Sequence, residues 1–158
     1  MTENSRWPQI EALYRADFAR FVRVARAIAG DQEIALEAVQ EGFADALRNA
    51  GQWNGRGSLE GWVWSCVVNR ARKARRRPIT EAWSDNHDNG SDARGDVDLR
   101  VRLAALPERQ RLAVFLRYFA DLEYREIASA LGIEVGTVSA TLHSAHAALR
   151  ESLKEVGA

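Results

Sequence analysis

Six of the eight residues from Arg70 to Arg77 are arginine or lysine, the densest concentration of charged side chains in the sequence. So many like charges repel one another unless a polyanion neutralises them. DNA phosphate is such a polyanion, and binding to it weakens steeply with salt. A solvated helix end that suits the helix dipole is the alternative interpretation. We expect phosphate contacts from Arg70, Arg72, Lys73, Arg76 and Arg77.

A tryptophan and an asparagine near this run are residue types that can grip an unpaired base. Trp53 offers a ring on which a base can stack, and the amide of Asn69 can both donate to and accept from adenine. Glycines in the loop Gln52–Ser58 let the backbone approach a strand closely. Trp64 lies off the apolar stripe of its helix, and we hypothesise that it is a wedge between bases. The predicted strand-binding residues are Trp53, Asn54, Arg56, Ser58, Trp64 and Asn69.

The remaining reactive side chains do not form a catalytic or metal-binding pattern. His143 and His146 are three residues apart, but no cysteine or third histidine lies near them, so zinc is not expected. The glycines around Arg56 lack the lysine and spacing of a phosphate-binding loop. We expect no catalytic residue, no metal and no cofactor, and therefore not an enzyme.

The charge of the chain sums to zero but is unevenly distributed. Residues 1–77 carry 13 basic and 9 acidic side chains, residues 78–97 carry 1 and 5, and residues 98–158 carry 8 and 8. A net charge of zero does not give a neutral surface when the charges are segregated along the chain, because charges act over about 10 Å at moderate salt. One cysteine, a polar start and no apolar run of about 20 residues predict a cytoplasmic protein without membrane insertion.

Helical periodicity dominates the first 77 residues. A first helix is expected from near Pro8 to Gly30, which suits the C′ position. Asp31 offers an N-cap for a second helix, and Ser58 offers one for a third that ends before Pro78. The segment Asn49–Gly57 between them is expected to be a loop.

The second half of the chain predicts another helical unit. Residues 78–97 are acidic and almost without aliphatic side chains, which is typical of a flexible linker. Helices are expected over 98–106, from Pro107 onward, and over 124–131, the last ended by Gly132. A further helix carries the inward stripe Val138, Leu142, Ala145 and Leu149. The short helix, glycine turn and long helix form a helix-turn-helix pattern, with a plain helical hairpin as the alternative.

The sequence is therefore predicted to be all-α, with two small helical domains, 1–77 and 98–158, joined by the acidic linker. Several motifs occur in order and together resemble extracytoplasmic-function (ECF) sigma factors of the sigma-70 family. The second domain resembles their region 4 through Leu106-Pro107-Glu108-Arg109-Gln110-Arg111, Leu116-Arg117-Tyr118-Phe119, Tyr124-Arg125-Glu126-Ile127-Ala128, Leu131-Gly132-Ile133 and Val135-Gly136-Thr137-Val138. The first domain resembles their region 2 through Leu13-Tyr14, Gly30-Asp31, Glu37-Ala38-Val39-Gln40-Glu41, Phe43, Gly55-Arg56-Gly57-Ser58, Trp62-Val63, Asn69 and Arg76-Arg77.

The resemblance implies a protein that binds core RNA polymerase, through its clamp helices and flap, and promoter DNA. Region 2 would read the −10 element and open the strands, and region 4 would read the −35 element. An anti-sigma protein is a typical further partner. The resemblance places polymerase contacts on the outer face of the second helix, at Glu37, Gln40, Glu41 and Asp45.

The expected recognition helix departs from the family pattern. Positions that are often basic in the family are Ser139, Thr141, Ser144 and His146 here, so we expect weak binding of free DNA, with the polymerase supplying affinity by tethering. The predicted −35 contacts are Arg125, Val135, Gly136, Thr137, Ser139, Ala140, Thr141, His143 and Ser144.

Two alternatives fit the same sequence. A stand-alone helix-turn-helix regulator would bind duplex DNA tightly without polymerase. A sigma-like protein without −35 readout would bind polymerase but not read DNA.

Overall fold

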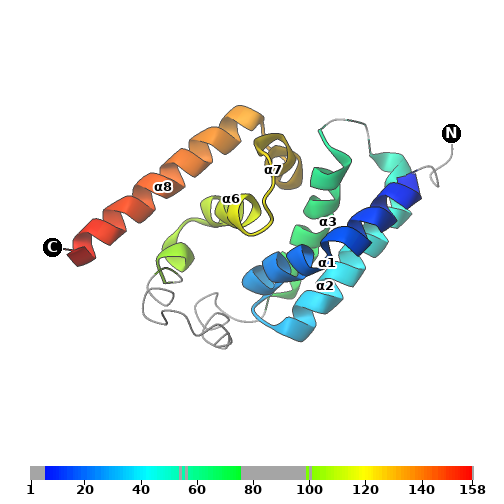
Figure 1. Cartoon of the computed structure of the whole chain (residues 1–158), viewed down its shortest axis with the longest axis horizontal. Coiled ribbons are helices and arrows are strands. Elements are labelled where there is room, and N and C mark those ends of the chain that lie inside the picture. The colour runs from blue at the N-terminus through cyan, green and yellow to red at the C-terminus, as the bar shows by residue number, and fades with distance from the viewer. Residues whose placement is uncertain (1–5, 54, 56, 76–98, 100, 158) are drawn as a thin grey trace.

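A computed structural model describes residues 6–53, 55, 57–75, 99 and 101–157 (Figure 1). Every regular element in these ranges is a helix, so the predicted all-α class is confirmed. The elements are α1 (Trp7–Ala29), α2 (Gln32–Arg48), the 3-10 helix η2 (Ala50–Gln52), α3 (Leu59–Ala74), α6 (Glu108–Tyr118), α7 (Tyr124–Leu131) and α8 (Val135–Gly157). No helix in the described ranges is both long enough and apolar enough to cross a membrane.

The helix ends lie where the capping residues predict them. The Asp31 carboxylate accepts a hydrogen bond of 3.1 Å from the Ile34 amide at the start of α2. The Ser58 hydroxyl accepts one of 2.9 Å from the Gly61 amide at the start of α3. Gly30 ends α1 at φ 90°, a left-handed conformation that glycine adopts without steric cost. Each cap satisfies a backbone group that the helix leaves unpaired.

Helices α1, α2 and α3 pack around an aromatic core. Phe21 stacks on Trp64 with ring centroids 3.8 Å apart, and Phe43 meets Phe21 edge to face at 4.8 Å. Helices α2 and α3 approach unusually closely at Gly42, where an added Cβ would lie 2.7 Å from the Val67 Cα. The first module is therefore held by ring packing and by one backbone-to-backbone crossing.

Helices α6, α7 and α8 form the second module, with residues 101–105 as a further helical segment. Its core includes Phe115, Leu116, Ile127, Val138 and Leu142, all at most 1% exposed. The predicted inward stripe of α8 is confirmed at Val138, Leu142 and Ala145, which are buried, while Leu149 packs at the edge. The turn between α7 and α8 is made by Gly132 at φ 68°.

The two modules touch each other directly. Helix α3 is flanked by α1 and α2 on one side and by α7 on the other (Figure 1). The predicted linker 78–97 lies outside the described residues. The contact between α3 and α7 joins residues far apart in the sequence and was not predicted.

Candidate nucleic-acid interface

The exposed basic surface lies at the C-terminal end of α3. Asn69, Arg72, Lys73 and Arg75 are there, and all four are exposed. With Glu108 they line a hollow of about 330 Å³. Among the described residues Glu108 is the one acidic side chain that lines the hollow, so the hollow can accept phosphate oxygens while Asn69 offers an amide to a base. The predicted contacts Arg76 and Arg77 lie outside the described residues.

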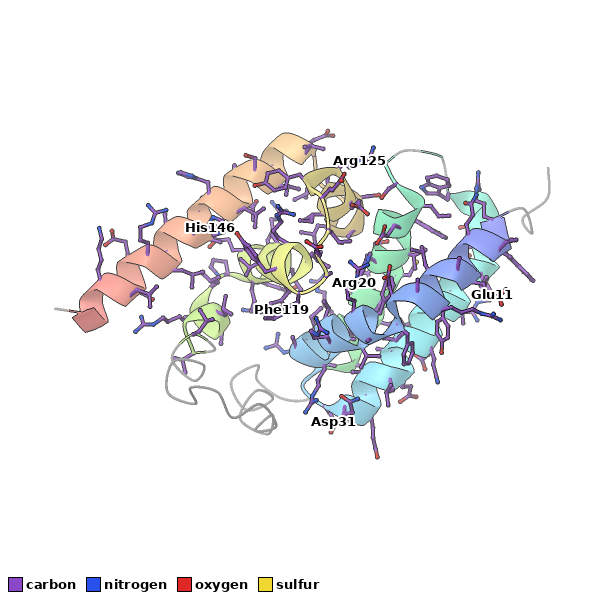
Figure 2. The ribbon with its side chains drawn as sticks, in the orientation of Figure 1. Glu11, Arg20, Asp31, Phe119, Arg125 and His146 are labelled. Atoms are coloured by element: carbon purple, nitrogen blue, oxygen red, sulfur yellow. The ribbon has the colours of Figure 1, made fainter. Side chains whose placement is uncertain are left out.

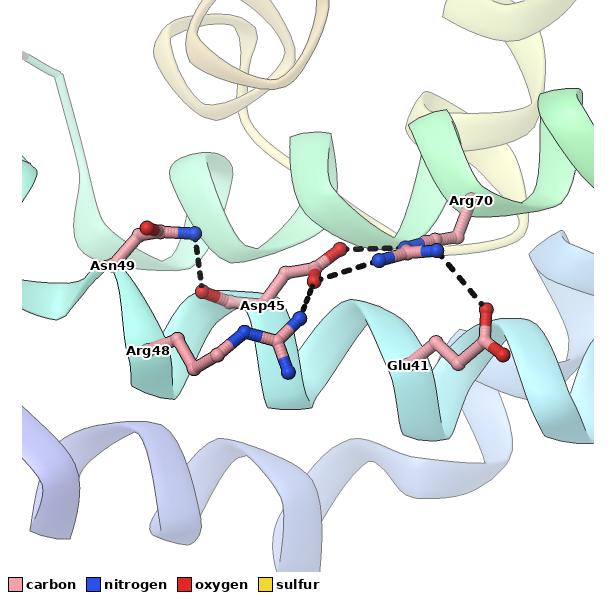
Figure 3. Close-up of polar contacts among 5 residues, drawn as sticks. All are labelled: Glu41, Asp45, Arg48, Asn49 and Arg70. Carbon is pink, nitrogen blue, oxygen red and sulfur yellow. Dashed lines mark hydrogen bonds and ion pairs between the residues drawn. The ribbon is translucent and has the colours of Figure 1, made fainter.

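Arg70 points away from this surface and joins α3 to α2 (Figure 3). Its guanidinium donates two hydrogen bonds to the Asp45 carboxylate, at 2.6 and 2.9 Å, and one of 3.3 Å to Glu41. The hydrogen bonds from Arg70 lower the pKa of Asp45, and Arg48 lowers it further. The phosphate contact of Arg70 stays a prediction, and in this structure its guanidinium is engaged within the module.

Trp53 lies before α3 and contacts Arg6. This side chain is half-buried, and the Arg6 guanidinium carbon lies 4.9 Å from the centroid of its ring. Ser58 serves as the cap of α3, so its hydroxyl is used within the protein. Asn54 and Arg56, also predicted here, lie outside the described residues.

Trp64 belongs to the core, so the prediction that it wedges between bases is wrong. Its side chain is 0% exposed and stacks on Phe21 with an interplanar angle of 19°. Helix α3 is covered by α1, α2 and α7, so its buried arc is wider than the single stripe that the sequence suggested. Val68, which is also off that stripe, is buried for the same reason.

The helix-turn-helix presents a polar, nearly uncharged face on α8. The exposed predicted residues are Val135, Gly136, Ser139, Ala140, His143 and Ser144. Thr137 is half-buried, and Thr141 is only 9% exposed, which corrects its predicted role in contacting bases. Arg125 is exposed on α7 and lies 3.4 Å from a Glu123 carboxylate oxygen. His146 faces α6, where its Nε2 is 2.8 Å from the Tyr118 hydroxyl (Figure 2).

The outer face of α2 combines acidic side chains with an apolar groove. Glu37, Gln40 and Glu41 are exposed there, while Asp45 is largely covered by its ion pairs. Beside them, α1 and α2 enclose a groove of about 380 Å³ lined by Trp7, Ile10, Glu11, Tyr14, Gln40, Phe43, Ala44 and Leu47. An apolar groove with an acidic rim suits a helical protein partner that carries basic and apolar side chains.

The contact between the modules covers the N-terminal part of α3. An added Cβ at Gly61 would lie 2.6 Å from both the Glu126 carbonyl oxygen and the Ser129 Cβ. Glu60 faces Glu126 there, and burial first, then the hydrogen bond and charge of Glu126, raise the pKa of Glu60 to about 7. The Gly61 position inside a helix was the one sequence signal for this close approach.

Two polar contacts extend this interface on either side of Gly61. Arg20 of α1 donates a 2.5 Å hydrogen bond to the Ala120 carbonyl oxygen just before α7 (Figure 2). Arg72 of α3 forms an ion pair with Glu108 of α6. Part of the exposed basic surface is thus engaged by the second module.

Comparison with known proteins accounts for both modules. Residues 13–78 match the family described as Sigma-70 region 2, and residues 96–149 match that described as Sigma-70, region 4. The RNA polymerase sigma factor SigV of Bacillus subtilis is 30% identical over 139 residues, covering 84% of each chain. The RNA polymerase sigma-E factor of Streptomyces avermitilis is 29% identical over 156 residues, covering 92% of this chain and 86% of its own.

A solved structure shares the fold. The structure of CnrH in complex with the cytosolic domain of CnrY superposes with a TM-score of 0.71 at 18% identity, covering 97% of this chain and 92% of CnrH. The likeness spans both modules.

Proposed function

This chain belongs to the sigma-70 family, in its extracytoplasmic-function group, and directs RNA polymerase to promoters; we propose that it does so by binding alone, without catalysis, in the cytoplasm. Its first module would bind the polymerase and the −10 element, and its second module the −35 element. The observation that supports the two roles of the first module is that it has two different faces: an acidic face with a groove on α2 and a basic face on α3.

The polymerase would dock on α2. Glu37, Gln40 and Glu41 present carboxylates and an amide to arginines of the clamp helices, and the groove beside them takes apolar side chains. Asp45 acts indirectly, because its ion pair with Arg70 fixes α2 against α3. The flap of the polymerase would contact the second module.

Promoter DNA would lie along the C-terminal end of α3. Arg72, Lys73 and Arg75 neutralise phosphates, and Asn69 reads an unpaired base by its amide. Trp53, just before the N-terminal end of α3, would offer its ring for stacking once the Arg6 guanidinium has moved off that ring. On α8, Ser139, His143 and Ser144 hydrogen-bond to the −35 duplex with little charge, so the polymerase supplies much of the affinity by tethering.

An anti-sigma protein is a further partner that we propose. Support comes from CnrH, whose fold this chain shares and which is solved with the cytosolic domain of CnrY. The groove between α1 and α2 offers a site that such a protein and the polymerase would compete for.

The experiment is transcription from a library of random DNA fragments by purified core polymerase with and without this protein, followed by mapping of transcript 5′ ends. We expect new start sites that share two upstream elements. Asn69→Ala should lower their yield while leaving polymerase binding unchanged. The exposed Arg23→Ala on α1 is the matched control and should transcribe as the wild type does.

Other outcomes separate the alternatives. Polymerase binding with no new start site would favour a sigma-like protein that does not read DNA. Tight duplex binding by the protein alone would favour a stand-alone regulator. No new start site together with no binding to core polymerase would refute the proposal.

A further inference from the structure

The N-terminal end of α1 is fastened to the segment that precedes α3. The Arg6 guanidinium donates a 2.6 Å hydrogen bond to the carbonyl oxygen of Ala50, which lies 44 positions later and is 0% exposed. The next residue, Trp7, donates a 3.1 Å hydrogen bond from its indole to the Leu47 carbonyl oxygen near the end of α2. Two hydrogen bonds from adjacent residues thus hold the Arg6 side chain beside η2.

The same guanidinium lies over the ring of Trp53. Its carbon is 4.9 Å from the ring centroid, which is within the about 6 Å at which an aromatic face attracts a cation. A guanidinium is planar and stacks on aromatic rings, and an unpaired base uses the same kind of surface when it binds a single-strand site. Arg6 therefore occupies the Trp53 ring in the way that a base would.

The segment that carries Trp53 is anchored on α2. The Gln52 amide donates a 2.9 Å hydrogen bond to the Asn49 carbonyl oxygen within η2. The Asn49 side chain in turn donates one of 2.9 Å to the Asp45 carbonyl oxygen. Trp53 follows directly and is half-buried. Because this segment is anchored, the long Arg6 side chain rather than the ring is the group that has to move when a base arrives.

We propose that Arg6 belongs to the strand-binding site, where its guanidinium holds the place of an unpaired base on the Trp53 ring and is displaced by that base. This role rests on the stacking role of Trp53 proposed above. Once displaced, the guanidinium can pair with a phosphate of the same strand. A base therefore stacks only in those molecules in which the guanidinium has left the ring.

The strength of this competition follows from the contact. A cation over an aromatic ring at an exposed site favours the covered state by about two- to fivefold. The apparent affinity for a strand is reduced by the fraction of molecules whose ring is uncovered, which here is a reduction of about three- to sixfold. Removal of the guanidinium also removes a positive charge, which weakens the binding of a polyanion. The two effects oppose each other and have to be measured separately.

The first measurement tests whether Arg6 covers the ring. The full-length chain is labelled with 5-fluorotryptophan at its five tryptophans, and the Trp53 fluorine resonance is identified as the one that disappears in Trp53→Phe. We expect this resonance to shift in Arg6→Ala without DNA, and in the wild type when a single-stranded deoxyadenosine 12-mer is added. Arg15→Ala, the matched control, removes a cation of α1 whose side chain is 78% exposed and should leave the resonance in place.

The second measurement separates the ring from the charge. The affinity for the same 12-mer at low salt is compared among the wild type, Arg6→Ala, Trp53→Ala and the double variant. Loss of the Arg6 charge weakens binding with and without the ring, so it cancels from this cycle. We expect Arg6→Ala to change the affinity about three- to sixfold more favourably when Trp53 is present than when it is absent. Arg6→Gln keeps a donor for the Ala50 carbonyl oxygen and should act in the same direction, which excludes a loss of local structure as the cause.

The unfavourable outcomes differ from one another. A Trp53 resonance that does not move in Arg6→Ala, or a ratio of one or less in the cycle, would overturn the place-holding role of Arg6. The stacking role of Trp53 would survive that result as long as Trp53→Ala binds the 12-mer more weakly than the wild type does. Equal binding by Trp53→Ala and the wild type would overturn both roles. Failure of promoter-directed transcription with the expected ratio would instead refute the proposed function and leave the role of Arg6 standing.

Discussion

Replacement of Trp64 tests whether this side chain is part of the core or contacts DNA. The side chain is 0% exposed and is stacked on Phe21 between α1 and α3. Removal of a buried tryptophan down to alanine costs about 3–5 kcal/mol, because the lost burial is compounded by a cavity that closes only in part. Domains of this kind are stabilised by about 5–15 kcal/mol in total. Trp64→Ala should therefore lose a large share of its folding free energy.

Trp64→Phe refines the same prediction. The indole Nε1 is buried and has no hydrogen-bond partner among the described residues, and a buried donor without a partner costs about 1–3 kcal/mol. Phenylalanine removes this unpaired donor and keeps a ring against Phe21. We expect it to destabilise the protein by less than half as much as alanine does.

The assay is urea unfolding followed by far-ultraviolet circular dichroism. Trp7→Ala is the matched control, since Trp7 is 43% exposed and its indole donates only to the Leu47 carbonyl oxygen. Its unfolding free energy should change by at most about 1 kcal/mol. If Trp64→Ala unfolds within about 0.5 kcal/mol of the wild type and loses only DNA opening, the assignment of Trp64 to the core is refuted.

Three further predictions concern charge and reactivity. Arg70 lowers the pKa of Asp45, so the ion pair stabilises the fold above the ordinary pKa of aspartate, and this stabilisation is lost as the pH falls. The urea midpoint of Asp45→Asn should therefore decline less between about pH 5 and pH 2 than that of the wild type. Equal declines would contradict the pairing. Lys73→Ala should reduce the slope of log affinity for DNA against log salt by about 0.9, and an unchanged slope would exclude a phosphate contact. Burial raises the pKa of the Cys66 thiol to about 11. Iodoacetamide at pH 8 should therefore modify Cys66 in the folded protein at least about tenfold more slowly than Cys66 in the urea-unfolded chain. Equal rates would show that the thiol is accessible in the folded protein.

The features that the sequence predicts well are local ones. Asp31 and Ser58 begin α2 and α3, and Gly30 ends α1, through bonds to residues three or four positions away. Their roles therefore depend on little beyond their neighbours. The inward positions of α8 are likewise set by helical spacing: Val138 and Leu142 are buried, and α8 packs on its neighbours α6 and α7.

Features that depend on three-dimensional packing were predicted poorly. A single apolar stripe places Trp64 at the surface because it assumes one buried face, whereas α3 is covered from several sides. Arg70 lies within a basic run, yet its partner Asp45 is 25 positions away in the sequence. The contact of Gly61 with α7 joins two modules across the predicted linker, and a glycine inside a helix indicates a close approach there without indicating which element approaches.

The crossing at Gly42 has a mechanical consequence. Helices α2 and α3 meet there without an intervening side chain, since even a methyl group would strike the Val67 backbone, and close-packed interiors of this kind are nearly incompressible. The Asp45–Arg70 ion pair links the same two helices a second time. The two helices should therefore move together, so that a displacement of α2 by the proposed polymerase contact would be passed directly to the proposed DNA-binding side of α3.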